Sequence, residues 1–180
     1  SYSVTGVQTC ALPISSETLL DKAILGLFYG CGLRKSEAQA LNIKDISFRS
    51  RLLYVRSGKG KRRRVVPITG KVTGDLKNYY QQERIRMLRK CKDPDREKAF
   101  ILNSQGGRML GQSFWRRLRY LVLKAGIENP GRITLHSLRH SIATHLLAGG
   151  LSVEQVRDFL GHTNIESTQI YTRIIVDNEK

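Results

Sequence analysis

The sequence predicts an α+β domain that is mainly helical and carries a small three-stranded antiparallel sheet. Apolar residues recur with the helical period over most of the 180 residues. The period then changes, and three short runs with the character of strands follow one another at 46–48, 52–55 and 65–68. A mainly helical chain with one small sheet belongs to the α+β class.

The individual elements follow from caps, glycines and periodicity. Ser15 or Ser16 is a suitable N-cap for a first helix that runs to about Tyr29, and Gly30 and Gly32 then end it. Its buried face holds Leu19, Leu20, Ala23, Ile24, Leu27 and Phe28. The second and third strands are joined by the basic, glycine-containing turn SGKGKRRR. The other elements are helices at about 34–41, 70–90, 111–125, 136–148, 152–160 and 166–174, and a short strand at 99–102 with a turn at 105–107.

The charge balance points to a polyanionic partner. Lysine and arginine total 31 against 15 aspartates and glutamates, a net charge of +16. Such an excess favours nucleic acid or an anionic membrane surface. No apolar run approaches the roughly 20 residues of a membrane span, and no basic amphipathic helix suits a membrane surface. Nucleic acid is therefore favoured, although a ribosomal or chromatin protein would satisfy the charge equally well.

All four histidines lie in the last quarter of the chain, and two of them share a predicted helical face with an arginine. His136, Arg139 and His140 stand at i, i+3 and i+4. The histidines have the spacing of a zinc pair, but a third ligand and the glutamate of HExxH are missing. His140 and His145 could instead satisfy backbone groups in the core. An arginine–histidine face suits an anion that gains charge during reaction, because a guanidinium offers a fixed fork of donors to phosphate oxygens.

Five motifs together resemble those of the tyrosine recombinases, the phage integrase family. They are GLRKSE at 32–37, SGKGK at 57–61, HSLRH at 136–140, LGH at 160–162 and IYT at 170–172. Tyr171 stands nine residues beyond His162, as the family's nucleophilic tyrosine does. Each motif alone is common, but all five occur in the expected order and spacing. The resemblance extends from about residue 20 to residue 175.

The resemblance implies a set of residues around a DNA phosphate. Arg34 and Arg139 would grip its non-bridging oxygens. His136 would add a hydrogen bond or transfer a proton, and His162 would bond or position the phosphate. Glu37 would orient Arg34 through an i,i+3 ion pair, with His140 as a further supporting residue.

The same resemblance implies a general acid and a nucleophile. Lys59 would protonate the leaving 5′-oxygen. Tyr171 would attack the phosphate, for which a phenol with a pKa near ~10 needs a cationic site. Alternatively, Lys59 is one more solvated contact to DNA phosphates, the role expected for Lys61, Arg62, Arg63 and Arg64.

The implied activity is that of a site-specific recombinase or integrase, which cuts and rejoins double-stranded DNA through a 3′-phosphotyrosyl intermediate. No metal, cofactor or nucleotide hydrolysis is expected, and no GxxxxGK[ST] phosphate loop is present. Three alternatives stay open. They are a type IB topoisomerase, a non-catalytic DNA-binding module with the same fold, and a zinc protein.

The resemblance also predicts how the chain is organised. Residues 1–14 are expected to be an appended segment foreign to the family, and residues 15–180 the catalytic domain. The N-terminal core-binding domain that closes the family's clamp around DNA is expected to be absent. A full-length protein is expected to be tetrameric on DNA, an isolated domain to be monomeric, and the location to be the cytoplasm of a bacterium.

Overall fold

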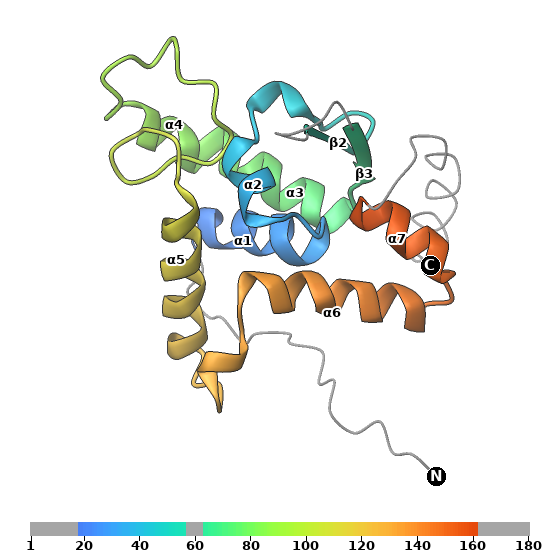
Figure 1. Ribbon diagram of the computed structural model, residues 1–180. Coiled ribbons are helices and arrows are strands. Elements are labelled where there is room, and N and C mark those ends of the chain that lie inside the picture. Colours follow the sequence, from blue (N-terminus) through green and yellow to red (C-terminus); the bar gives the residue numbers. More distant parts are fainter. Residues whose placement is uncertain (1–17, 57–62, 162–180) are drawn as a thin grey trace.

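The computed structural model describes residues 18–56 and 63–161 (Figure 1). It is mainly helical with one three-stranded antiparallel sheet, which confirms the predicted fold class. The segment 1–14, the turn at 57–61 and the helix predicted at 166–174 lie outside the described residues.

The predicted elements that fall within the described residues occur in the predicted order, except for the strand at 99–102, and two short helical turns, η2 and η4, were not predicted. The described elements are α1 (Leu19–Leu25), η1 (Gly26–Gly30), α2 (Lys35–Ala40), η2 (Ile43–Asp45), β1 (Ile46–Ser47), β2 (Leu52–Arg56), β3 (Arg63–Pro67), α3 (Gly70–Asn78), η3 (Tyr79–Glu83), α4 (Arg84–Leu88), α5 (Gly111–Lys124), η4 (Pro130–Arg132), α6 (Leu135–Ala148) and α7 (Val153–Leu160). The π-helical turns η1 and η3 continue α1 and α3, so α3, η3 and α4 form the one long helix predicted at 70–90.

The first helix is capped by Thr18, and the prediction of Ser15 or Ser16 is corrected. The Thr18 side chain accepts a hydrogen bond from the backbone of Asp21, whose carboxylate in turn accepts one from the Thr18 N–H at 3.0 Å. This reciprocal pair satisfies two backbone donors that a helix start leaves open. Arg117 of α5 donates to the same carboxylate at 2.7 Å, which joins the two helices.

The core lies around α1 and η1, which run through the middle of the molecule between α3 and α6 (Figure 1). Phe28 and Phe114 meet edge to face with ring centroids 5.4 Å apart, which packs α5 against η1. Val72 of α3 contacts η1 so closely that a Cβ built on Gly30 would stand 2.6 Å from its side chain. The two helices can approach because residue 30 has no side chain.

The sheet places β2 between β1 and β3. Leu53 pairs with Val66, and Val55 pairs with Arg64. Directly opposite residues of an antiparallel pair point to the same face. Leu53, Val55 and Val66 are buried, so Arg64 also points toward the interior, on the strand that α7 contacts (Figure 1).

The strand predicted at 99–102 is wrong. Residues 99 and 102 make only isolated bridges, to Asn42 and to Arg108. Two of the backbone groups pair with side chains: Arg84 donates to the Ala99 carbonyl at 2.8 Å, and the Leu102 N–H donates to the Tyr79 hydroxyl at 2.9 Å. Two others pair with backbone outside any strand, since the Phe100 N–H donates to the Leu41 carbonyl and the Ile101 carbonyl accepts from the Met109 N–H. Because these groups are already satisfied, the segment is buried without joining a sheet.

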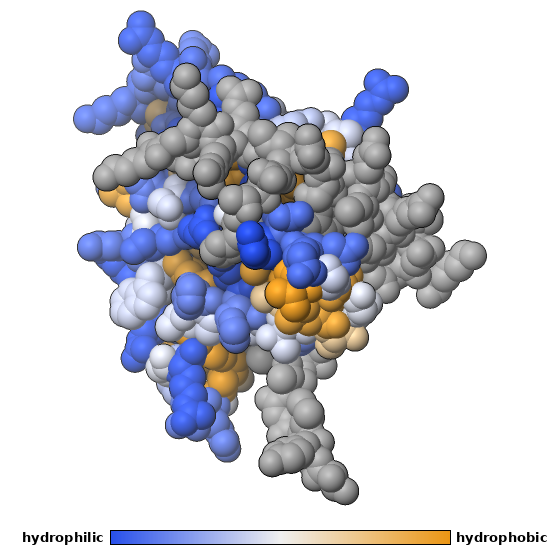
Figure 2. Space-filling model, turned by 45° about the vertical axis from the view of Figure 1, so that its right-hand side comes forward, coloured by the Kyte–Doolittle hydropathy of each residue, from blue (hydrophilic) through white to orange (hydrophobic). Residues whose placement is uncertain are grey.

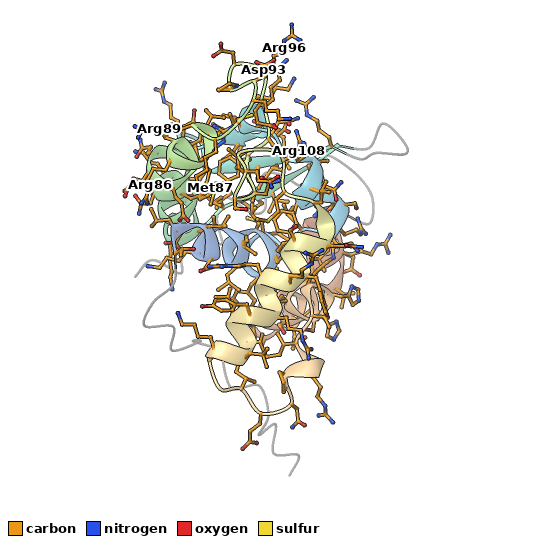
Figure 3. All side chains as sticks on the ribbon, turned by 90° about the vertical axis from the view of Figure 1, so that its left-hand side faces the viewer. Arg86, Met87, Arg89, Asp93, Arg96 and Arg108 are labelled. Atoms are coloured by element: carbon orange, nitrogen blue, oxygen red, sulfur yellow. The ribbon has the colours of Figure 1, made fainter. Side chains whose placement is uncertain are left out.

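Arginines near α4 illustrate two different surroundings. Arg86 and Arg89 project from this helix, and Arg96 on the following loop forms an exposed ion pair with Asp93 at 3.4 Å (Figure 3). Arg108 instead holds the end of α2, donating to the carbonyl of Gln39 at 2.7 Å.

In the part of the chain that the structure describes, no helix is long and apolar enough to cross a membrane.

Candidate active site

The segment between η1 and α2 presents Arg34. Gly32 adopts a left-handed backbone, with φ of 58°, which turns the chain after the helix. Leu33 is then buried and anchors the segment, while the Arg34 side chain stays 44% exposed. Arg34 is also the N-cap residue of α2, so its position is set by the start of that helix.

Glu37 holds Arg34 in two ways. Its carboxylate accepts a hydrogen bond from the Arg34 backbone N–H at 2.7 Å and one from the Arg34 guanidinium at 3.1 Å. The predicted i,i+3 ion pair is therefore confirmed. The bond to the backbone also caps α2, so the same carboxylate defines the helix start and orients the arginine.

Arg64 binds the same carboxylate, which corrects one prediction. Its two terminal nitrogens donate to the two oxygens of Glu37 at 2.6 and 3.0 Å, and its side chain is only 12% exposed. Arg64 is thus not a solvated contact, because the alternation of β3 turns it inward beside Val66. That alternation was visible in the sequence and could have identified Arg64 as an interior residue.

The electrostatics of Glu37 reflect these arginines. Burial alone would raise the pKa of its carboxyl group. The hydrogen bonds from Arg64 and the positive charges of Arg64 and Arg34 outweigh burial, so the pKa of Glu37 lies below its ordinary value. The carboxylate is therefore ionised at neutral pH and balances part of the positive charge around it.

Arg139 lies on the inner side of α6. It is buried, and its guanidinium donates to the carbonyls of Gly32 and Leu160. It also lies 3.9 Å from the Glu37 carboxylate. Burial, and then the charges of Arg64 and Arg34, lower the pKa of Arg139 to about 10, so it remains a cation at neutral pH. Arg139 joins α6, the end of α7 and the turn before Arg34.

The predicted arginine–histidine face of α6 is divided in the structure. His136 and His140 are exposed, whereas Arg139 is buried. This exposure does not fit the alternative that His140 satisfies a group in the core. His145 is partly buried, and its Nδ1 hydrogen-bonds the Tyr29 hydroxyl of η1. Its partner is thus a side chain and not the expected backbone group.

One pocket of about 670 Å³ brings the predicted residues together. Arg34 lies at its α2 side, and His136 and Arg139 lie at its α6 side. Three sides of the pocket come from the starts of α2, α5 and α6, and it is lined by Leu33, Arg34, Lys35, Ser36, Gln112, Trp115, Thr134, Leu135, His136 and Arg139. Three cationic residues, two arginines and Lys35, and the imidazole of His136 around one open space can bind a phosphate and stabilise charge that develops on it.

The sequence analysis did not single out Gln112 and Trp115. They stand on the first two turns of α5, and the end of that helix that lines the pocket is set by contacts distant in sequence. The Gly111 N–H, for example, donates to the side chain of Gln39 on α2 at 2.8 Å. The periodicity of α5 predicts a helix but does not show which exposed residues face the pocket.

The remaining predicted site residues lie outside the described part of the chain. These are Lys59, Lys61, Arg62, His162 and Tyr171, together with the side chain of Arg63. The described chain resumes at β3 and ends at Gly161, next to His162 in the sequence. On the face shown in Figure 2 most of the described surface is hydrophilic, with a compact hydrophobic patch and several smaller hydrophobic spots.

Comparisons with known proteins agree with this arrangement. A family model described as "Phage integrase family" matches residues 7–176. A tyrosine recombinase XerD of Oceanobacillus iheyensis is 39% identical over 154 residues, which cover 86% of this chain and 50% of the relative. A tyrosine recombinase XerC of Chlamydia trachomatis serovar L2 is 40% identical over 166 residues, covering 89% of this chain and 48% of the relative. The chain thus spans about half the length of the curated relatives it matches.

Solved structures share the fold. A crystal structure of XerA recombinase superposes with a TM-score of 0.67 at 26% identity, covering 91% of this chain and 62% of that one. XerH site-specific recombinase bound to a palindromic difH substrate gives a TM-score of 0.66 at 22% identity, covering 92% of this chain and 46% of that one. At 22% identity, the similarity to XerH supports the fold alone.

Proposed function

Because the chain belongs to the phage integrase family, we propose that it carries the catalytic domain of a site-specific DNA recombinase. This proposal rests on the observation that Arg34, His136 and Arg139 line the same pocket. Glu37 orients the first of these arginines, and the last is held by two backbone carbonyls. A phosphodiester in this pocket would meet two guanidinium groups, the donors best suited to its non-bridging oxygens.

In the proposed reaction Tyr171 is the nucleophile. Its phenolic oxygen attacks the phosphorus and forms a 3′-phosphotyrosyl bond while the bond from phosphorus to the 5′-oxygen breaks. The phenolic proton leaves by way of His136, and Lys59 donates a proton to the departing 5′-oxygen. Attack by a 5′-hydroxyl of another strand then reverses these steps, so no nucleotide is hydrolysed.

The other predicted residues complete the proposed site. His162 bonds or positions the phosphate, and His140 supports the α6 side. Lys61, Arg62 and Arg63 contact DNA phosphates beside the site, where many cations add affinity without adding sequence information.

The proposed partner is double-stranded DNA, and XerH, which shares the fold, was solved bound to its difH substrate. We propose residues 15–180 as the catalytic domain and residues 1–14 as an appended segment, although the family match begins at residue 7. The full-length protein is proposed to act as a tetramer on DNA in the bacterial cytoplasm. The isolated domain is proposed to be a monomer, which its mass in solution tests.

Covalent trapping tests the function. A nicked DNA substrate, whose short 5′-hydroxyl fragment diffuses away after cleavage, is incubated with the chain and resolved by denaturing electrophoresis. We expect a covalent adduct with the unchanged chain, and none with Tyr171→Phe. Tyr54→Phe is the matched control, since it removes one phenolic hydroxyl from a partly exposed residue of β2 outside the proposed site.

Each outcome of this experiment separates the proposal from its alternatives. An adduct that persists in Tyr171→Phe contradicts the nucleophile, and no adduct from the unchanged chain favours a non-catalytic DNA-binding module. Relaxation of supercoiled DNA without exchange between two sites would place the activity with type IB topoisomerases.

A further inference from the structure

Arg64 occupies an unusual place for a strand arginine. It stands opposite the buried Val55 and points to the interior face of the sheet. Its two terminal nitrogens form parallel hydrogen bonds with both oxygens of Glu37, the geometry that a guanidinium alone can supply. Its Nε is buried and has no hydrogen-bond partner among the described residues. Burying a cation with one donor unsatisfied costs free energy, so the position needs a reason beyond fold stability.

The bound carboxylate is shared with the proposed phosphate clamp. Glu37 accepts from the guanidinium of Arg34 and lies 3.9 Å from that of Arg139. Without Arg64, the Glu37 carboxylate would keep its hydrogen bond from the Arg34 backbone N–H but would lose both bonds that fix the plane of its two oxygens. Arg34, which is 44% exposed, would then lose its defined orientation.

Arg64 also contacts the end of α7. Gly161 has a left-handed backbone with φ of 86°, and a Cβ built there would stand 2.6 Å from the Nη1 atom of Arg64. Leu160, the residue before it, accepts a hydrogen bond from Arg139. In the sequence Gly161 immediately precedes His162, and Lys59 stands five residues before Arg64. One side chain therefore joins β3, α2 and the end of α7.

We propose that Arg64 is a positioning residue of the active site, which holds Glu37 and through it Arg34 in the orientation that grips the scissile phosphate. It does not contact the phosphate itself. This inference rests on the proposed function and deepens it. Its effect falls on the chemical step, because misplacing a charged group by a fraction of a bond length weakens transition-state stabilisation more than it weakens DNA binding.

The cleavage test uses Arg64→Gln and Arg64→Lys at saturating concentrations of the nicked substrate. We expect Arg64→Gln to lower the rate of adduct formation by about tenfold or more, with DNA affinity changed by less than about twofold. Arg64→Lys keeps the charge but lacks the planar fork, so it should recover only part of the rate. The matched control is Arg117→Gln, which also removes an arginine from a buried carboxylate, Asp21, but outside the pocket.

A second comparison separates positioning from a general loss of folded protein. In an Arg34→Ala background, Arg64→Gln should cause no further loss of rate, because the residue through which it acts is already gone. Arg117→Gln should lower thermal stability while each folded molecule cleaves at the unchanged rate. A loss of rate in Arg64→Gln that only follows the folded fraction, or that multiplies with Arg34→Ala, overturns the proposal.

The last measurement does not depend on DNA cleavage. The pKa of Glu37 is followed by the carbon NMR shift of its carboxyl group, in the unchanged chain and in Arg64→Gln. We expect the pKa to rise when Arg64 is replaced. If the unchanged chain forms no adduct, the proposed function fails, while this titration still decides whether Arg64 controls Glu37. An unchanged pKa, or wild-type cleavage by Arg64→Gln, contradicts the inference.

Discussion

The guanidinium group of Arg139 donates a hydrogen bond to the backbone carbonyl of Gly32, which lies two residues before Arg34. The two arginines of the pocket are therefore joined through the main chain, although they are distant in the sequence. Arg139 is buried and Arg34 is 44% exposed, so the same substitution should have different effects on stability at the two positions.

Replacing either arginine by alanine should lower DNA cleavage by at least ~10²-fold, as for removal of one oxyanion donor. Arg139→Ala should also lower the free energy of unfolding by about 1–2 kcal/mol, because the carbonyls of Gly32 and Leu160 lose their donor while repulsion from neighbouring arginines is relieved. Arg34→Ala should be nearly neutral in the same urea denaturation experiment. Equal losses of stability would contradict the different burial of the two side chains.

Gly161→Ala should destabilise the protein by more than the cost of placing an alanine in a left-handed backbone conformation. The new Cβ would meet Arg64 as well as adopting an unfavourable φ of 86°. Gly126→Ala is the matched control, because φ is 64° there and no atom lies within 4 Å of the new Cβ. We expect a cost of about 1 kcal/mol for the control and a larger one for Gly161→Ala, measured by thermal denaturation. Equal costs would mean that Arg64 moves aside freely.

Acid should weaken the protein through Glu37. The pKa of its carboxyl group is lower in the folded chain than the ordinary value of 4.5, despite burial, because of Arg64 and Arg34. Its ion pairs therefore stabilise the fold fully above that value, and this contribution is lost as the pH falls through the folded-state pKa. Urea denaturation at a series of pH values should show a loss of stability below about 4.5 that is smaller in Glu37→Gln.

Asp21 contributes a similar loss, because hydrogen bonds from Arg117 and Thr18 outweigh burial and lower the pKa of its carboxyl group below 3.8. The Asp21→Asn variant should therefore still lose, at low pH, the part of its stability that the ion pairs of Glu37 contribute. If Glu37→Gln and the unchanged chain lose stability in parallel, the ion pairs of Glu37 do not stabilise the fold.

DNA binding should depend steeply on salt. The chain carries a net charge of +16, and exposed arginines such as Arg86 and Arg89 add to the positive surface. Each phosphate neutralised on duplex DNA should contribute about −0.9 to the slope of log affinity against log salt concentration. Fluorescence anisotropy with a labelled duplex over a range of salt concentrations measures this slope. A nearly flat response would argue against duplex DNA as the partner.

The sequence by itself determined the fold class and most of the elements. Helices such as α5 and α6 have apolar residues at the helical period. This pattern is local, so it can be recognised without knowing which elements pack against the helix. The same holds for the closeness of Arg34 and Glu37, because residues three apart at a helix start are neighbours on the helix surface. The motifs likewise pointed to the residues that the pocket brings together.

Tertiary structure decided the surroundings of those residues. The apolar run at 99–102 has the composition of a strand, but Arg84 and Tyr79 take two of the backbone groups that a sheet would need. The strand alternation can indicate that Arg64, in a basic run, points inward, but only the folded chain shows that its partner there is Glu37. The burial and the hydrogen bonds of a residue depend on residues far away in the chain. A single sequence does not show which distant residues come into contact.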